Sequence, residues 1–260
     1  MKAMIFCAGL GTRLKPLTDT MPKALVPLAG KPLLQWQVEK LRDAGITDII
    51  VNAHHFPDMI IDTIRRNNGW DCNITISDER DQLLDTGGGL KKIKNEKLKI
   101  NNEPILACNV DILSNIDLRA LVAGYSGNSG RSGLLVVSER ETQRYLCFDE
   151  QDRLCGWTNI KTGEVKPENF KSQISNFKLL AFSGMQILSP EVLALLPQMP
   201  QDKFSLIDFY LAICEKTITN HQSPITNLKA YVPPEYRMMD VGKIDTLDQA
   251  DSFLKQLGGG

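Results

Sequence analysis

The chain has 260 residues, with 30 Lys and Arg residues against 31 Asp and Glu residues and a formal net charge of −1. Hydrophobic residues make up 42% of the chain, which excludes a disordered protein because a sizeable core can be buried. Without an excess of basic charge, the chain is not expected to bind nucleic acid or an anionic membrane surface in bulk.

Short apolar runs alternate with helical patterns through the first half of the chain. Residues 2–8 are apolar on both faces and end at a glycine, which is typical of a buried parallel strand. Proline in the first turn and glycine past the end delimit a helix at 32–44. Further strands are predicted at 48–53, 73–77 and 104–109, and further helices at 57–68 and from 89 to 94. This alternation predicts an α/β fold with a largely parallel sheet.

The pattern changes in the second half of the chain. Apolar runs at 145–149 and 154–158 flank a polar turn, which predicts a β-hairpin and not another strand–helix–strand unit. Ser189 and Pro190 predict the start of a helix, with serine as its cap. The remaining elements are predicted as a strand at 178–184 and helices at 205–216 and 244–256. No repeat or low-complexity linker interrupts the chain, so we expect a single domain over residues 1–260.

Hydropathy and cysteine usage predict a cytoplasmic protein. No apolar run approaches the ~20 residues that cross a bilayer. The apolar start is broken at Gly9, too early for the core of a signal peptide. The six cysteines form no Cys-x-x-Cys pair and several lie in apolar runs, which favours reduced core thiols over disulfides or zinc ligands. The three glycines at 258–260 are predicted to form a flexible tail.

A loop with two glycines directly follows the first predicted strand. Residues 9–11 can bring backbone N–H groups close to an anion, and Arg13 and Lys15 place cations beside them. The loop is not a dinucleotide fingerprint, because Leu14 stands where the third glycine is required, and no Walker Gly-Lys-Ser/Thr follows. Two glycines alone favour a plain turn, so the prediction of an anion site depends on the two cations.

A second loop offers a lysine at a fixed place. Pro22, Pro27 and Pro32 stiffen this stretch, and Lys23 lies within it. A solvated surface lysine is the alternative interpretation, and it holds for most lysines.

Together these stretches resemble the nucleotide-sugar pyrophosphorylases, which join a sugar 1-phosphate to a nucleoside triphosphate. The pattern of that family is G-x-G-x-R-x-x-P-L-T, then P-K-x-L, then G-K-P, and it is matched by residues 9–18, 22–25 and 30–32. The resemblance implies the nucleotide-diphospho-sugar transferase fold, a Rossmann-like, mostly parallel (mixed) sheet flanked by helices. It also implies a nucleotide-binding half at about 1–140 and a sugar-binding half at about 141–260.

The resemblance implies roles for individual residues. In the family the glycine loop wraps the triphosphate, and the arginine and the P-K-x-L lysine neutralise the phosphates, which implies catalytic roles for Arg13 and Lys23. Residues 84–89 resemble the segment beside the nucleobase, where a glycine turn brings backbone amides and carbonyls to the base edge. The residues expected to bind the nucleotide are Ala8, Gly9, Gly11, Thr12, Arg13, Lys23, Thr86, Gly87, Gly88 and Asn109.

Two aspartates far apart in the sequence match the metal ligands of the family. Residues 106–111 resemble a strand that ends in N-G-D, and residues 239–245 resemble a late D-I-G-T-P segment. The resemblance implies that Asp111 and Asp240 hold Mg²⁺. Val110 replaces the glycine of the first pattern, and residues 243–244 replace the Thr-Pro of the second, but both aspartates are present. Either aspartate taken alone is more typical of a turn or cap, so the metal pair depends on the resemblance.

The second half carries the residues expected at the sugar. Residues 182–190 resemble the F-x-G-I-x-x-x-S-P stretch of the family, which implies that Ser183 and Gly184 lie near the sugar. Asn159 follows the predicted hairpin and is a further candidate for the sugar pocket. The histidine pair at 54–55 is interpreted as a loop that flanks the nucleotide.

The implied reaction is attack by a sugar 1-phosphate oxygen on the α-phosphorus of a nucleoside triphosphate, with release of pyrophosphate. Length and the segment 86–89 resemble most the N-acetylmuramate 1-phosphate uridylyltransferase type of cell-wall recycling, which favours UTP and a UDP-N-acetylmuramate product. A guanylyltransferase for mannose or heptose 1-phosphate stays open as an alternative. Since little chain follows residue 240, no attached acyltransferase domain is expected.

Two interpretations from other classes stay open. A non-catalytic nucleotide-sugar-sensing subunit would share the fold, but the presence of Arg13, Lys23, Asp111 and Asp240 argues against it. A dinucleotide-dependent oxidoreductase is indicated only by the glycine loop, and Leu14 argues against it. The sequence leaves the sugar, the oligomeric state and any regulator open.

Overall fold

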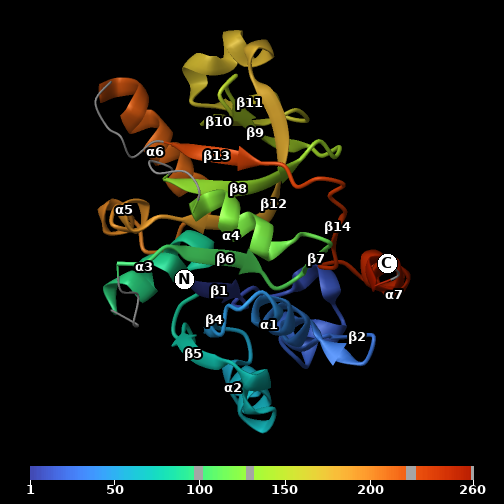
Figure 1. Ribbon diagram of the computed structural model, residues 1–260. Coiled ribbons are helices and arrows are strands. Elements are labelled where there is room, and N and C mark those ends of the chain that lie inside the picture. The colour runs from blue at the N-terminus through green and yellow to red at the C-terminus, as the bar shows by residue number, and fades with distance from the viewer. Residues whose placement is uncertain (97–101, 127–131, 221–226, 259–260) are drawn as a thin grey trace.

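The computed structural model describes residues 1–96, 102–126, 132–220 and 227–258. Its main feature is a ten-stranded mixed sheet in the order β11-β10-β9-β12-β6-β1-β4-β5, with β8 paired to β12 and β13 paired to β8 (Figure 1). The strands of this sheet are β1 (Lys2–Phe6), β4 (Asp48–Ala53), β5 (Asn73–Asp78), β6 (Ile105–Asn109), β8 (Gly133–Ser138), β9 (Arg144–Phe148), β10 (Leu154–Asn159), β11 (Glu164–Lys166), β12 (Lys178–Leu188) and β13 (Leu228–Tyr231).

The parallel part of the sheet consists of β6, β1, β4 and β5. Phe6 at the end of β1 lies in register with Asn109 of β6 and with Asn52 of β4. The carboxyl ends of these strands therefore lie at one edge, where the loops after β1 and β6 leave the sheet and where ligands bind in open α/β sheets. β12 joins β6 in the antiparallel sense, so the predicted α/β fold with a mixed sheet is confirmed.

Helices pack on both faces of the sheet. Alternate residues of β1 point to opposite faces, so Ala3 and Ile5 share a core with α1 and α7, while Met4 and Phe6 share a second core with α3 and α6. This two-sided burial explains the uninterrupted apolar run at the start of the chain. The helices are α1 (Leu33–Asp43), α2 (Pro57–Arg66), α3 (Asp85–Asn95), α4 (Leu118–Ser126), α5 (Pro190–Leu193), α6 (Leu206–Asn220) and α7 (Ile244–Gly258). None of the helices in the described ranges combines the length and the hydropathy that a bilayer crossing requires.

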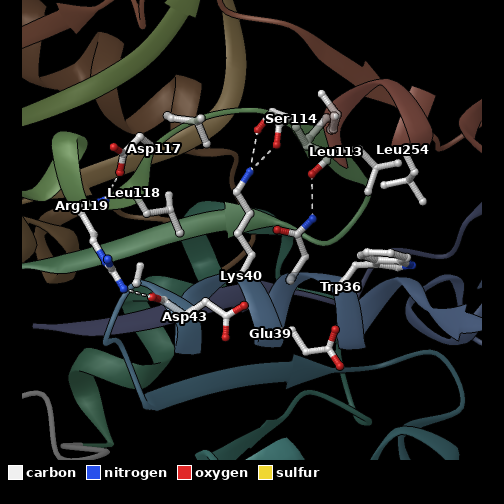
Figure 2. Close-up of a pocket in the computed structure, with 15 residues that line it drawn as sticks. Trp36, Glu39, Lys40, Asp43, Leu113, Ser114, Asp117, Leu118, Arg119 and Leu254 are labelled. Carbon is white, nitrogen blue, oxygen red and sulfur yellow. Dashed lines mark hydrogen bonds between the residues drawn. The ribbon is translucent and has the colours of Figure 1, made fainter. Parts of the chain in front are cut away.

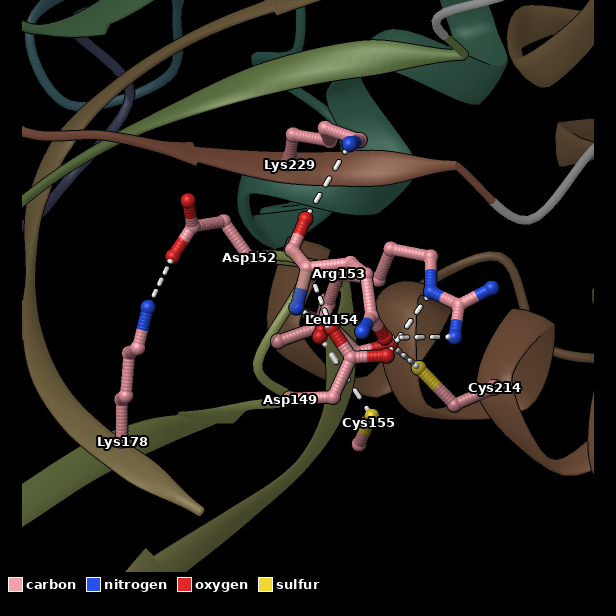
Figure 3. A network of polar contacts seen from close by, with 9 residues as sticks. Asp149, Asp152, Arg153, Leu154, Cys155, Lys178, Cys214 and Lys229 are labelled. Carbon is pink, nitrogen blue, oxygen red and sulfur yellow. Dashed lines mark hydrogen bonds and ion pairs between the residues drawn. The ribbon is translucent and has the colours of Figure 1, made fainter.

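The predicted hairpin is formed by β9 and β10, and its turn is tied to the rest of the sheet (Figure 3). Asp149 closes the turn by accepting hydrogen bonds from the backbone N–H of Arg153 at 2.8 Å and from its Nε at 2.7 Å. Asp152 pairs with Lys178 of β12 at 2.8 Å, and Lys229 of β13 donates to a carbonyl oxygen of the turn at 3.1 Å. The second half of the chain therefore continues the same sheet.

Four short strands form two small sheets that the sequence did not predict. They are β2 (Pro27–Leu28) with β3 (Lys31–Pro32), and β7 (Ile112–Ser114) with β14 (Met238–Asp240). Runs of two or three residues are too short to show a period, so their partners can be identified only in the folded chain.

Several helix boundaries differ from the predictions. α2 ends at Arg66 and not at residue 68, and α6 ends at Asn220 and not at residue 216. α3 begins at Asp85 and not at residue 89, so three glycines lie inside it. Gly258 is the last residue of α7, so the described part of the predicted tail is helical, and residues 259–260 lie outside the described range.

Candidate active site

A cavity of about 440 Å³ opens at the carboxyl ends of β1 and β6. Its wall is formed by residues from several separate stretches of the chain. They are Phe6, Cys7, Ala8, Gly9, Arg13, Lys23, Asn52, Leu83, Asp85, Thr86, Asn109, Val110, Asp111 and Lys203. Of the residues predicted to bind nucleotide, phosphate or metal, this cavity brings together Ala8, Gly9, Arg13, Lys23, Thr86, Asn109 and Asp111.

The loop after β1 folds tightly because Gly11 adopts a left-handed conformation, with φ of 65°. A Cβ at this position would lie 2.7 Å from Cγ2 of Thr18 and 3.1 Å from Cβ of Lys23. Thr18 also donates a hydrogen bond from Oγ1 to the Gly11 carbonyl at 2.8 Å. Gly11 therefore shapes the loop beside Lys23. Neither Gly11 nor Thr12 lines the cavity.

Two cations and two carboxylates meet beside the cavity. Nζ of Lys23 contacts Oδ2 of Asp111, and both side chains are largely buried. Nη1 of Arg13 lies 3.4 Å from Oδ2 of Asp240, and both of these side chains are about half exposed. Asp240 ends β14, which pairs with β7 directly after Asp111, and the Val241 amide donates to the Asp111 carbonyl at 2.9 Å. The small β7–β14 sheet thus brings the two predicted metal ligands together.

The backbone at Gly242 shows how closely these groups converge. A Cβ there would lie 2.6 Å from Oδ2 of Asp111, 2.7 Å from Oδ1 of Asp240 and 2.9 Å from Nη2 of Arg13. No side chain larger than that of glycine fits at this point without moving one of the three groups. Gly242 therefore permits the close approach on which the site depends.

Burial and like charge act on the two carboxylates in different ways. Burial raises the pKa of Asp111 above its usual value, and the neighbouring Asp240 raises it further, although Lys23 opposes both effects. Partial burial also acts to raise the pKa of Asp240. The Gly242 amide, which donates to it at 2.8 Å, and the Arg13 charge outweigh this effect and hold that pKa below its usual value.

The carboxylate pair is suited to a hard divalent cation. In the described ranges no group of three or more His, Cys, Asp or Glu side chains could hold a metal ion. An ion bound by these two carboxylates would take its other ligands from water and phosphate oxygens, which is the usual coordination of Mg²⁺ in proteins. The donor set therefore fits the predicted ion.

Comparison with known proteins agrees with this arrangement. The sequence profile of the nucleotidyl transferase family matches residues 2–256. The chain belongs to this family. The resemblance to nucleotide-sugar pyrophosphorylases is thereby confirmed.

Two curated relatives of this chain are named for different substrates. Mannose-1-phosphate guanyltransferase 2 of Candida glabrata is 31% identical over 202 residues, which cover 77% of this chain and 53% of that protein. N-acetylmuramate alpha-1-phosphate uridylyltransferase of Caulobacter vibrioides is 31% identical over 218 residues, which cover 80% of this chain and 82% of that protein. The chain thus spans about half the length of the guanyltransferase.

A solved structure of similar fold is that of HddC from Yersinia pseudotuberculosis in complex with GMP-PN. It superposes with a TM-score of 0.70 at 22% sequence identity and covers 98% of this chain and 99% of that chain. At this identity the likeness concerns the fold alone.

The expected glycine turn beside the base is instead the first turn of α3 in this family member. The amides of Gly87 and Gly88 both donate to the carbonyl oxygen of Phe204, at 3.0 and 3.1 Å. A Cβ at Gly87 would lie 2.5 Å from the Phe204 ring, and a Cβ at Gly88 would lie 2.1 Å from the carbonyl oxygen of Asp202. These glycines therefore allow another segment to pack on the helix, and they do not line the cavity. The same stretch contributes Thr86 to the cavity wall.

The three predicted sugar residues lie outside the cavity lining. Gly184, with φ of 69°, lies beside Asn109, since a Cβ there would come within 2.7 Å of Nδ2 of Asn109. Ser183 is buried next to it. Asn159 is also buried and accepts a hydrogen bond from the Lys161 amide at 3.0 Å, which stabilises the turn after β10.

A buried polar chain, which the sequence analysis missed, connects two walls of the cavity. Oδ1 of Asn52 accepts a hydrogen bond from the Cys7 amide at 2.7 Å, and its Nδ2 donates to Oε1 of Glu79 at 2.8 Å. Oε2 of Glu79 accepts from the Leu84 amide at 3.4 Å. The glycine loop and the start of α3 are thus fixed to each other. An asparagine inside the apolar strand 48–53 was the available signal. The histidine pair at 54–55 contacts backbone oxygens of Glu79 and Thr18 and does not line the cavity.

A second cavity of about 620 Å³ lies between α1, α7 and the segment from β7 to α4 (Figure 2). Nζ of Lys40 donates to the carbonyl oxygen of Ser114 at 2.7 Å and to its Oγ at 2.9 Å. Nε2 of Gln37 donates to the Ile112 carbonyl at 2.7 Å. Through these bonds α1 holds β7, the strand that directly follows Asp111. Burial lowers the pKa of Lys40 to about 8.

Replacing Lys40 by methionine should remove a pH-dependent part of the stability. The folded pKa of about 8 lies below the usual lysine value, so the unfolded chain binds more protons between pH 8 and 10. Lys40 therefore makes the free energy of unfolding increase with pH over this interval, by up to about 3 kcal/mol. Urea unfolding at pH 7.5 and pH 10 measures the effect. The free energy of unfolding should increase more between these pH values for the wild type than for Lys40→Met. The exposed Lys171→Met serves as control, and a pH-independent difference for Lys40→Met would contradict the assignment.

Proposed function

We propose that this chain joins a sugar 1-phosphate to a nucleoside triphosphate and releases pyrophosphate, giving a nucleotide sugar. The observation that carries the proposal is the convergence of Arg13, Lys23, Asp111 and Asp240, from separate segments, beside one cavity at the carboxyl ends of parallel strands. A non-catalytic sensing subunit would not require this set of cations and carboxylates around a single point.

The chemistry follows from the charges that the site provides. An oxygen of the sugar phosphate attacks the α-phosphorus, and the bond from that phosphorus to the bridging oxygen of pyrophosphate breaks. The attacking oxygen is already anionic, so no general base or covalent enzyme intermediate is needed. The protein has to bring two anions together and stabilise the charge that develops on pyrophosphate.

Each cation has a distinct place in this scheme. Lys23 lies deep beside Asp111 and steadies the α-phosphate and the sugar phosphate. Arg13 is more exposed and binds the leaving pyrophosphate with its planar guanidinium, which can contact two oxygens at once. Asp111 and Asp240 would hold Mg²⁺, which would supply positive charge to the phosphate oxygens when bound.

For the substrates we propose that the nucleotide is UTP, so that the product is UDP-N-acetylmuramate. Its support is the Caulobacter uridylyltransferase, which this chain matches over most of the length of both proteins. A guanylyltransferase for mannose or heptose 1-phosphate is the second candidate, favoured by the equal identity to the Candida guanyltransferase.

Pyrophosphate release is measured for each combination of four nucleoside triphosphates with several sugar 1-phosphates. This experiment tests both the proposed reaction and the proposed substrates. We expect the highest rate with UTP and N-acetylmuramate 1-phosphate. A higher rate with GTP at equal concentration would reject the uridylyltransferase and favour the second candidate. No release with any pair in the presence of Mg²⁺ would reject the enzyme and favour the sensing subunit.

A further inference from the structure

The segment 199–206, which leads into α6, lies across the first turn of α3. The Phe204 amide donates to the Leu84 carbonyl at 3.2 Å, and the Phe204 carbonyl accepts from both Gly87 and Gly88. The Leu206 amide donates to Oγ1 of Thr86 at 3.0 Å. Phe204 is buried, so this segment is held at its centre by backbone hydrogen bonds and an apolar side chain.

A lysine on α3 fixes the other end of the segment. Nζ of Lys91 donates to the carbonyl oxygens of Met199 and Gln201, both at 3.0 Å, and to Oδ1 of Asp202 at 2.8 Å. The backbone is therefore fixed on both sides of residue 203.

Lys203 itself has no polar partner among the described residues. Its side chain is exposed and lines the cavity of the active site, and it makes no hydrogen bond or ion pair with any residue in the described part of the chain. Its neighbours Asp202 and Phe204 are both engaged with α3. An ammonium group on a fixed backbone, facing a ligand cavity, is suited to contact the ligand.

The neighbours of Lys203 indicate which part of the ligand it meets. The segment 199–206 is bonded to residues 84–88, and the cavity residues of that wall are Leu83, Asp85 and Thr86. A phosphate does not suit this wall, because the exposed carboxylate of Asp85 would repel it. That carboxylate accepts a hydrogen bond from the Thr86 amide at 2.6 Å and has no cation within ion-pair distance in the described ranges. The amides of Gly87 and Gly88 are also already occupied by the Phe204 carbonyl. The phosphate-binding groups lie instead on the loops that carry Arg13 and Lys23.

We propose that Lys203 donates a hydrogen bond from Nζ to an acceptor atom on the nucleobase, so that the segment 199–206 forms a second wall of the base site. The proposal rests on the proposed function, since it takes a nucleotide as the ligand. Uracil and guanine both carry ring carbonyl oxygens that accept such a bond. Lys203 thus binds the base and does not take part in the transfer of the phosphoryl group.

The test compares Lys203→Met, Lys203→Arg and the wild type in titrations with UTP, GTP and pyrophosphate, each with Mg²⁺. Loss of a charge-assisted hydrogen bond weakens binding by about tenfold or more. We expect Lys203→Met to raise the dissociation constant of the preferred triphosphate by this factor and to change that of pyrophosphate by less than twofold. Lys203→Arg should restore most of the triphosphate affinity. The exposed Lys171→Met should behave as the wild type.

The same variants are then assayed in both directions of the reaction. Lys203→Met should raise the KM for the triphosphate and for the nucleotide sugar by a similar factor, with kcat and the KM for pyrophosphate unchanged. If Lys203→Met weakens the binding of triphosphate and pyrophosphate equally, Lys203 contacts the phosphates and the proposal is wrong. If it leaves the binding of both unchanged, Lys203 contacts neither part of the nucleotide and the proposal is also wrong. If the wild type binds nucleotide but transfers nothing, the proposed function fails while the titrations still decide the role of Lys203.

Discussion

Pyrophosphate release should fall by about 10²-fold or more when either Asp111 or Asp240 is replaced by asparagine, by comparison with the loss of one preorganised group at other active sites. Asparagine keeps the shape of the side chain but removes its negative charge. The remaining carboxylate alone would hold Mg²⁺ too weakly to neutralise the phosphates. Initial rates at increasing Mg²⁺ concentration measure the effect, and part of the loss should be recovered at high Mg²⁺.

The double variant Asp111→Asn, Asp240→Asn should be hardly slower than either single variant, because groups that serve one ion are not additive. Losses that multiply would mean that the two carboxylates act independently. Full activity of the wild type in excess chelator would remove the metal from the mechanism. Asp62→Asn, which changes a half-exposed carboxylate on α2, is the matched control and should keep the wild-type rate.

The melting temperature of Asp240→Asn should stay close to that of the wild type. Its ion pair with Arg13 is about half exposed on both sides, and pairs of this kind contribute only about 0–1 kcal/mol. A large fall in the melting temperature of Asp240→Asn would instead favour a structural role for this aspartate.

Arg13→Ala should lower kcat and kcat/KM together by about 10²-fold, as expected when an interaction made mainly in the transition state is removed. The reason is that charge moves onto pyrophosphate as it leaves, and Arg13 is the more exposed of the two cations at the site. The protein should remain folded because the side chain takes no part in the core. Circular dichroism melting and steady-state kinetics of the same preparation measure both quantities.

Lys15→Ala is the matched control for Arg13→Ala. Lys15 belongs to the same loop and is exposed, but its ion pair is with Asp19 at 3.0 Å, and it does not line the cavity. Its loss should leave the turnover within a factor of a few. Near-normal turnover of Arg13→Ala, or an equal loss in both variants, would speak against a specific contact of Arg13 with phosphate.

The parts of the site that the sequence predicted are those that follow a strand in the chain. The run 2–8 is apolar on both faces because both faces of β1 are covered, and this pattern can be seen without a structure. The loop that follows must then lie at the edge of the sheet. Cations in that loop are therefore candidates for the ligand site. Arg13 lines the cavity, whereas Lys15 of the same loop does not.

Other parts depend on contacts that leave no local pattern. The start of α3 was missed because glycine is a poor helix former, and here packing of Phe204 against Gly87 overrides that preference. Lys203 stands in a polar stretch with no motif, and only the contacts of the segment 199–206 with α3 bring it to the cavity. The sugar residues were assigned by resemblance alone, and their roles stay predictions.

The pairing of β7 with β14 also has a consequence for the order in which the chain is synthesised. Lys23 and Asp111 are present once β1 and β6 can pair, whereas Asp240 and the strand that carries it emerge from the ribosome much later. A nascent chain at the earlier stage has the loop after β1 but only one of the two carboxylates. We therefore expect stalled ribosome complexes that expose residues up to about 230, and so include Lys203 but lack β14, to bind nucleotide poorly even with Mg²⁺. Binding should appear only when β14 has paired with β7.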